Sequence, residues 1–267
     1  MGVESISKVK TIEEAASLVS DGDRLAMGGL LLQRIPSAFA RELARQGKSG
    51  LKVMKTAANY DFDLLCLADC LEEVAAGFVS FEAEFGLAPN FRRAVQDGKL
   101  RFEENSCYTV ISSLRAAGFG VPFMPIANLG ESYIANKFKT VSNPYGDGEV
   151  LAVPAIYPDW AVIHVQKADE EGNAIIYGPV YEDVIMTRAA KKIILTTEKI
   201  VSREEINEEG DLAIIPGFKV AAVAEVPKGA SPGACYPYYD YSPRLVKEYL
   251  SIKDRDGLKS YLEEFRP

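Results

Sequence analysis

The stretch from Asp21 to Pro36, DGDRLAMGGLLLQRIP, constrains the fold more than any other part of the chain. Leu25 to Gly28 is typical of a short buried strand, and the glycine pair Gly28 and Gly29 ends it. A helical pattern begins at Pro36, because a proline in the first turn of a helix loses no hydrogen bond. The glycines therefore lie on a strand-to-helix turn, which is where α/β sheets bind ligands.

The same alternation of strand and helix continues along the chain. Strand patterns such as Leu51–Thr56, Val74–Ser80 and Trp160–Ala168 are separated by helical ones. This order predicts an α/β fold, with an open, mostly parallel sheet and helices on both faces. We expect Ile126–Gly148 to form long loops and Arg203–Asp211 to form a solvated loop or face.

The composition is that of an ordinary globular protein and excludes several functions. Of the 267 residues, 48% are hydrophobic and 25% are charged, with a net charge of −8. This charge, without a basic stripe, argues against nucleic acid as a partner. No apolar run approaches the ~20 residues of a membrane span, and residues 1–10 lack the apolar core of a signal peptide. No internal repeat or linker divides the chain, so we expect one domain over residues 1–267 in the cytoplasm.

The cysteines and the histidine do not indicate a metal site. The four cysteines are scattered and form no CxxC pair, and His164 is the single histidine. A metal centre is therefore not expected, and free cysteines suit a reducing cytoplasm. His164 lies in the middle of a strand pattern, where a hydrogen-bonded core histidine is the simpler interpretation.

The glycine stretch resembles the first signature of the family I coenzyme A transferases, on the A-subunit side. Matching positions are Asp21, Gly22, the apolar Leu25–Met27, Gly28–Gly29 and Pro36. Leu30 stands where the signature has Phe, and Arg34 stands where it has a second Gly. Four further blocks resemble A subunits of the glutaconate coenzyme A-transferase type, namely Lys99–Pro125, Val141–Gly178, Ala189–Ile206 and Pro227–Tyr249.

The resemblance implies a two-subunit transferase that moves coenzyme A between an acyl-coenzyme A thioester and a free carboxylic acid. In this family the nucleophile that attacks the thioester is a glutamate of the B subunit, within a Ser-Glu-Asn-Gly or Glu-Ser-Gly motif. This chain contains neither motif, and its nearest analogue is Glu103–Ser106, EENS. The implied partner is thus a B subunit, in a hetero-oligomer such as A2B2. Coenzyme A would be a substrate, with no permanently bound cofactor.

Two groups near the signature could contribute to this chemistry. The resemblance implies that Gly28, Gly29 and Leu30 offer backbone N–H groups to the oxyanion, although a loop that only closes the sheet onto a helix is the alternative. Arg34 is either an exposed surface arginine or a fork that binds a substrate carboxylate. The glutaconate-type branch also has an arginine there, so a dicarboxylate-like acyl group is conceivable.

A second set of candidates follows the strand pattern that ends near Glu103. Glu103, Glu104 and Ser106 could line the acyl pocket, or they could simply cap the next helix with favourable acids in its first turn. The alternative function is a related hydrolase that cleaves a carbon–carbon bond of a cyclic acyl-coenzyme A. Glu104 would then be the general base. A ligand sensor on the same fold would need an additional DNA-binding segment, for which the pattern leaves no room.

Overall fold

A central parallel sheet organises the computed structural model, which describes residues 7–127 and 129–265. The signal-peptide expectation rests partly on residues 1–6, which lie outside this range. The parallel strands of the described chain run in the order β4-β3-β2-β1-β8-β10-β12, and β9 and β11 add an antiparallel extension beside β8. Their bounds are β1 Arg24–Met27, β2 Leu51–Ala58, β3 Leu71–Val79, β4 Arg101–Glu104, β8 Trp160–Ala168, β9 Ala174–Ile175, β10 Lys192–Ile200, β11 Ala213–Ile215 and β12 Val220–Glu225.

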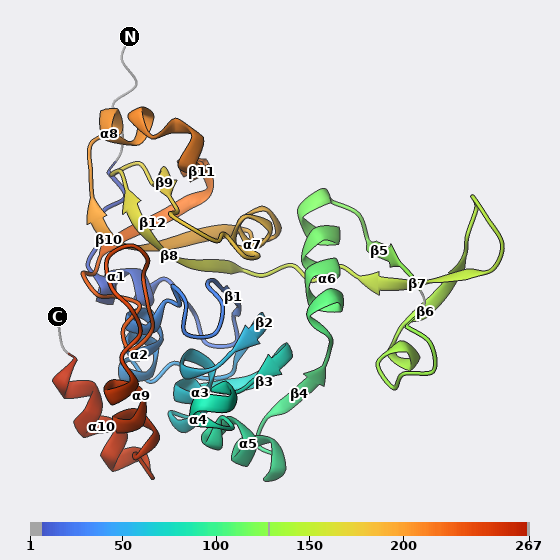
Figure 1. Ribbon diagram of the computed structural model, residues 1–267, viewed down its shortest axis with the longest axis horizontal. Coiled ribbons are helices and arrows are strands. Elements are labelled where there is room, and N and C mark those ends of the chain that lie inside the picture. Colours follow the sequence, from blue (N-terminus) through green and yellow to red (C-terminus); the bar gives the residue numbers. More distant parts are fainter. Residues whose placement is uncertain (1–6, 128, 266–267) are drawn as a thin grey trace.

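Alternate residues of each central strand are buried on opposite faces of the sheet. Leu25 of β1 packs with Phe39 in one hydrophobic cluster, whereas Ala26 packs with Leu114 in a second cluster on the other face. Burial on both faces explains why the sequences of these strands are nearly continuous runs of apolar residues. The predicted α/β class, with a mostly parallel sheet between two layers of helices, is confirmed (Figure 1).

The two clusters divide most of the helices between the faces. The first cluster takes residues from α1, α2 and α3, and the second takes residues from α6 and α7. Near the C-terminus, α9 and α10 pack with α3 in a further cluster. The bounds are α1 Ile12–Ser17, α2 Ser37–Arg45, α3 Tyr60–Leu67, α4 Glu82–Phe85, α5 Pro89–Gln96, α6 Cys107–Phe119, α7 Asp183–Ala189, α8 Arg203–Glu208, α9 Pro243–Leu250 and α10 Arg255–Glu264.

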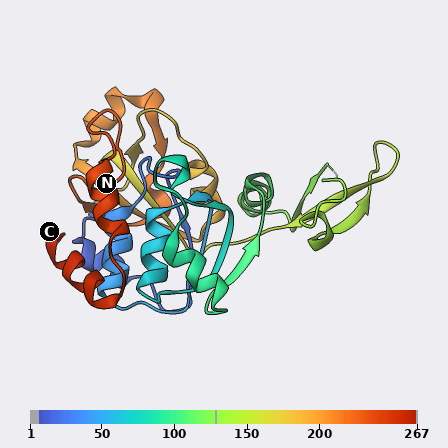
Figure 2. The same cartoon turned by 60° about the horizontal axis from the view of Figure 1, so that its bottom comes forward.

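An arm projects from the body beside α6, as both views show (Figures 1 and 2). It is a three-stranded antiparallel sheet of β5 Phe123–Ile126, β7 Glu149–Pro154 and β6 Lys139–Ser142, with its own small apolar cluster. The prediction of long loops over residues 126–148 was therefore wrong for β6. The polar Asn, Gly, Pro and Ser residues there form the connections, while the strands between them are too short to show a clear period.

A second correction concerns α8, because Arg203–Asp211 was expected to be a solvated loop or face. Ser202 caps this helix by accepting a hydrogen bond from the N–H of Glu205, and Glu204 and Glu205 lie in its first turn. A capping serine followed by acids is a helix-start signal that the sequence does carry. None of the helices in the described part of the chain is long and apolar enough to cross a membrane. One domain over residues 1–267 remains a prediction.

The parallel order brings the loops that follow β1, β2, β3 and β4 to one edge of the sheet. We call it the carboxyl edge. The predicted glycine turn follows β1, and the predicted Glu103–Ser106 segment ends β4 at the same edge. Three strand spacings of about 4.8 Å separate these strands, which places β1 and β4 about 14 Å apart.

Candidate functional site

The three backbone N–H groups expected to face an oxyanion are each engaged within the chain. Gly28 donates to the carbonyl of Val162 at 2.8 Å, and Leu30 donates to that of Gln33 at 2.9 Å. Gly29 donates to Oδ1 of Asp183 at 2.9 Å. In this structure these amides already have acceptors within the chain, so the geometry adds no support for the expected oxyanion role, which stays a prediction.

The glycines are required here by close packing. A Cβ on Gly28 would lie 2.7 Å from Cδ1 of Ile163 and 2.8 Å from Oδ1 of Asp183. Gly29 has φ +70°, and a Cβ there would lie 2.5 Å from the carbonyl oxygen of Arg34. Both positions thus exclude side chains because the chain itself occupies the space. This supports the interpretation of a turn that closes the sheet onto its neighbours.

Arg34 does not fit the exposed surface arginine that was one of its two interpretations. Its side chain is buried, and Nη2 lies 2.5 Å from Oδ2 of Asp183 in an ion pair. The guanidinium also donates to the carbonyls of His164 at 2.9 Å and Pro179 at 3.2 Å. It is therefore not an exposed arginine, and its charge is already matched by Asp183. A direct role in binding a substrate carboxylate is not supported.

Sequence reasoning missed two buried acids, of which Asp183 holds this turn and Glu182 binds β2. Asp183 joins Gly29 to Arg34, and the neighbouring Glu182 accepts a hydrogen bond from the N–H of Thr56 at 3.1 Å. Both acids are buried at the start of α7. Adjacent acids before a helix were the available signal, but that pattern is also ordinary helix capping, and nothing in it names the distant partners.

Leu30 lines a cavity of about 430 Å³ at the carboxyl edge. The turn from Leu30 to Gln33 forms one wall, and residues 81–85, which follow β3, form another with Tyr241. Leu31 and Glu82 have φ values of +49° and +60°, conformations that are costly for residues other than glycine. Such strain is common where a ligand site needs a particular backbone shape. Gly28, Gly29 and Arg34 do not line this cavity.

The candidates that follow β4 lie apart from this cavity. Glu103 is half-buried and Glu104 is exposed, at the end of the strand at the sheet edge. Ser106 is the N-cap of α6 and accepts a hydrogen bond from the N–H of Thr109 at 3.1 Å. None of the three lines the cavity beside Leu30, so the structure brings the two predicted sets to one edge without joining them.

His164 lies in a hydrogen-bonded network inside the body. Its Nδ1 is 2.9 Å from Oγ1 of Thr196, and its Nε2 is 2.9 Å from Oε1 of Glu198. Burial lowers the pKa of His164 more than the Glu198 carboxylate raises it. Burial alone would raise the pKa of Glu198, but the hydrogen bonds from His164, Tyr239 and the backbone N–H of Lys228 lower it.

The same network contains a group of possible metal ligands. Ligand atoms of His164, Glu198 and Cys235 lie within 4.8 Å of one another. Burial raises the pKa of the Cys235 thiol to about 12, which opposes the thiolate that a metal requires. Glu198 already bonds His164 and Tyr239, so the described contacts satisfy the network as hydrogen bonds.

Three comparisons with known proteins, by family, by sequence and by structure, indicate the same family. Residues 9–226 match the family described as coenzyme A transferase. The chain is 32% identical to the A subunit of glutaconate CoA-transferase from Acidaminococcus fermentans, covering 97% of this chain and 88% of that protein. It superposes on the crystal structure of that enzyme with a TM-score of 0.91 and 31% identity, over 97% of this chain and 88% of that chain.

Other relatives carry different names. The chain is 35% identical to an uncharacterized protein of Archaeoglobus fulgidus, spanning 98% of this chain and 60% of that protein. It is 29% identical to the cholesterol ring-cleaving hydrolase IpdA subunit of Mycobacterium tuberculosis, over 91% of this chain and 87% of that protein. A variant of the decarboxylase AibA/AibB superposes with a TM-score of 0.87 and 30% identity, over 97% of this chain and all of that one. By its match to the family over most of its length, the chain belongs to the coenzyme A transferases.

Proposed function

We propose that this chain is the A subunit of a two-subunit enzyme that transfers coenzyme A between an acyl-coenzyme A and a free carboxylic acid. The observation that carries the proposal is the turn after β1. It matches the family signature in sequence, and its continuation, Leu30–Gln33, lines a cavity at the carboxyl edge. Relatives over nearly the whole chain are named as A subunits of such enzymes. A cytoplasmic location is part of the proposal.

In this proposal a partner B subunit supplies the nucleophilic glutamate, since the sequence lacks the family motif for it. The glutamate carboxylate adds to the thioester carbonyl, the carbon–sulfur bond breaks, and an acyl-glutamyl anhydride and coenzyme A thiolate form. The thiolate then attacks the glutamyl carbonyl and releases the first acid. A second carboxylate reverses both steps, which returns the glutamate and gives the new thioester.

This chain would contribute one wall of the acyl site. The wall consists of Leu30–Gln33 and residues 81–85, and its apolar side chains exclude water from the reacting thioester. Gly29, Arg34 and Asp183 lie behind this wall and hold its backbone in place. Their role in the proposal is to position the turn, and the oxyanion donors would come from other groups of the complex.

The test is to produce the chain with its partner, most simply as a hetero-oligomer such as A2B2, and to measure transfer between acetyl-coenzyme A and a set of carboxylic acids. The complex should transfer, and neither chain alone should. Mass spectrometry after incubation with acyl-coenzyme A should show a coenzyme A adduct on the partner only. An adduct on this chain would place the nucleophile here and contradict the proposal that the partner subunit supplies it.

A carbon–carbon hydrolase is the second candidate, favoured by one observation. Glu104 is exposed at the carboxyl end of β4, where a general base could reach a substrate. Relatives from Mycobacterium tuberculosis and Rhodococcus jostii are also named as ring-cleaving hydrolase subunits. In that case the complex would form no coenzyme A adduct. Glu104→Gln would abolish hydrolysis of a cyclic 1,3-dioxo acyl-coenzyme A, while the neighbouring Glu103→Gln would retain it.

A further inference from the structure

Three cations are almost completely buried in the described part of the chain, and they differ in their partners. Arg34 pairs with Asp183 at 2.5 Å, and Lys55 pairs with Asp61 at 2.6 Å. Arg41 is only 4% exposed, yet no carboxylate of the described residues lies within 4 Å of its guanidinium. A buried charge without a counter-ion is costly, so this exception calls for an anion.

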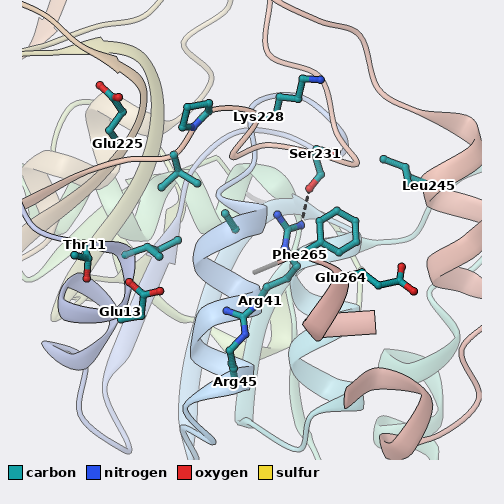
Figure 3. Close-up of a pocket in the computed structure, with 14 residues that line it drawn as sticks. Thr11, Glu13, Arg41, Arg45, Glu225, Lys228, Ser231, Leu245, Glu264 and Phe265 are labelled. Atoms are coloured by element: carbon teal, nitrogen blue, oxygen red, sulfur yellow. Dashed lines mark hydrogen bonds between the residues drawn. The ribbon is translucent and has the colours of Figure 1, made fainter. Parts of the chain in front are cut away.

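The guanidinium of Arg41 has only neutral partners among the described residues. Nη1 donates to the carbonyl of Ser231 at 2.6 Å, and the ring centroid of Phe265 lies 4.5 Å from Cζ (Figure 3). Nη1 also donates to the hydroxyl of Tyr60 at 3.2 Å. Within residues 7–127 and 129–265, Nε and Nη2 make no hydrogen bond. The Nε and Nη2 nitrogens lie on one side of the planar guanidinium, and both can therefore donate hydrogen bonds to a ligand.

These donors belong to the wall of a cavity of about 740 Å³. In Figure 3, Arg41 extends from α2 to Ser231 beside Phe265, and Arg45 projects from the same helix further from Ser231. Arg45 pairs with Glu42, but its Nε is buried without a hydrogen-bond partner in the described chain. Apolar side chains complete the walls, among them Ile12, Ala38, Val226, Leu245 and Phe265.

We propose that this cavity binds an organic monocarboxylate with an apolar body, the carboxylate resting on Arg41. A carboxylate matches the guanidinium fork in shape and charge, and it would supply the counter-ion that the described residues lack. The apolar walls suit an alkyl or aromatic body, whose burial strengthens binding as the chain lengthens.

The charges at the cavity mouth select against a polyanion such as coenzyme A. Three exposed acids, Glu13, Glu225 and Glu264, line the cavity with a single exposed cation, Lys228. A ligand that carries several negative charges would meet this acidic rim, whereas a single carboxylate can pass to the buried guanidinium. No described residue lines both this cavity and the one beside Leu30, so the site is separate from the proposed reaction site.

Calorimetric titration of the full chain tests the proposal with matched probes. Hexanoate should bind at least about 10-fold more tightly than hexanamide, which keeps the body but loses the charge. It should also bind at least about 10-fold more tightly than acetate, which keeps the charge but loses the body. Inorganic phosphate and coenzyme A should not compete with hexanoate. Equal binding of hexanoate and hexanamide, or displacement by phosphate or coenzyme A, would overturn the proposal.

Variants then assign the binding to this cavity. Arg41→Gln should weaken hexanoate at least about 10-fold and leave hexanamide unchanged. The control Lys191→Gln, at an exposed lysine that does not line the cavity, should leave hexanoate binding within about 2-fold of the parent. Leu245→Trp keeps Arg41 but narrows the cavity from the side of α9, so it should also weaken hexanoate binding. This variant provides the test if Arg41→Gln does not fold. Hexanoate binding that survives Leu245→Trp and any folded Arg41→Gln belongs to another site and refutes the assignment. Because binding is measured without turnover, the result is independent of the proposed transferase activity.

Discussion

At the residue scale, Gly29 shows how a turn that matches a catalytic signature is fixed by packing. Its N–H bonds Asp183, its φ is +70°, and the carbonyl of Arg34 occupies the space where a side chain would begin. Gly22 has a similar φ of +82°, but nothing lies within 4 Å of the position of its Cβ. A comparison of the same substitution at the two glycines therefore distinguishes the cost of backbone strain from the cost of a steric clash.

We expect Gly29→Ala to destabilise the chain far more than Gly22→Ala. Both variants carry the left-handed strain of about 1–2 kcal/mol, and only Gly29→Ala adds a clash that costs about 1–3 kcal/mol more. Denaturant unfolding of both variants measures the difference. Equal losses of stability would mean that the turn relaxes freely and that the glycine is kept for another reason.

The buried His164 predicts a pH dependence of stability. Its pKa in the folded chain is below the ordinary 6.5, chiefly because of burial. Below pH 6.5 the unfolded chain binds a proton that the folded chain resists, so stability should fall as the pH drops, by at most about 1.4 kcal/mol per pH unit. The lowered pKa of Glu198 affects stability in a separate pH range, because the stability that this carboxylate contributes is lost only as the pH falls below about 4.5.

The check is to compare the free energy of unfolding of the parent and of His164→Gln between about pH 5 and pH 7. The variant should be less stable at neutral pH but should depend less on pH, since it lacks the titrating group. Parallel pH profiles for the two proteins would show that His164 does not titrate in this window.

At the element scale, α6 illustrates how a helix start and a candidate site can share the same residues. Ser106 and Thr109 form a reciprocal cap, in which the serine hydroxyl accepts from one backbone N–H and the threonine hydroxyl accepts from the other. This cap satisfies two donors that the first helical turn leaves free. Ser106 therefore has a folding role, and its place in the acyl pocket stays a prediction.

We expect Ser106→Ala to lower stability by about 1 kcal/mol and Ser106→Asp to preserve it, because aspartate is also a good N-cap. Thermal and denaturant unfolding measure the stabilities, and turnover is measured on the complex of each variant with the partner chain. If Ser106 only caps the helix, both variants keep turnover within a few-fold. A large loss in both would restore the acyl-pocket role.

At the scale of the whole molecule, the arm stands apart from the body in its packing. Its buried residues Ile126, Ala135, Leu151 and Val153 form a cluster of their own, and Phe123 and Pro154 pair at its base. The body therefore buries its core without the arm, and the two chain ends at the base are close enough for a short turn to join them.

Replacing residues 124–153 with an Asn-Gly turn should leave the body folded. We expect the melting temperature to change by only a few degrees, because the clusters that include β1, β2 and β8 stay intact. Circular dichroism and size-exclusion chromatography would check this. Loss of cooperative unfolding would show that the arm is part of one indivisible domain over residues 1–267.

The sequence by itself determined most of the element types and the position of the turn, but it did not reveal α8 or β6. Periods of apolar residues, capping signals and the glycine pair are local, so they predicted the parallel sheet, the helices on both faces and the turn after β1. They were weakest for β6, where four residues hold too few positions to establish a period.

Only the tertiary structure decided which side chains meet. Asp183 lies 154 positions from Gly29 in the chain, and no local pattern states that its carboxylate takes the Gly29 N–H and the charge of Arg34. The same holds for Arg41, whose lack of an acidic partner among the described residues is visible only once distant segments have packed around it. Charges on a sequence can be counted, but their pairing depends on distances that the folded chain alone defines.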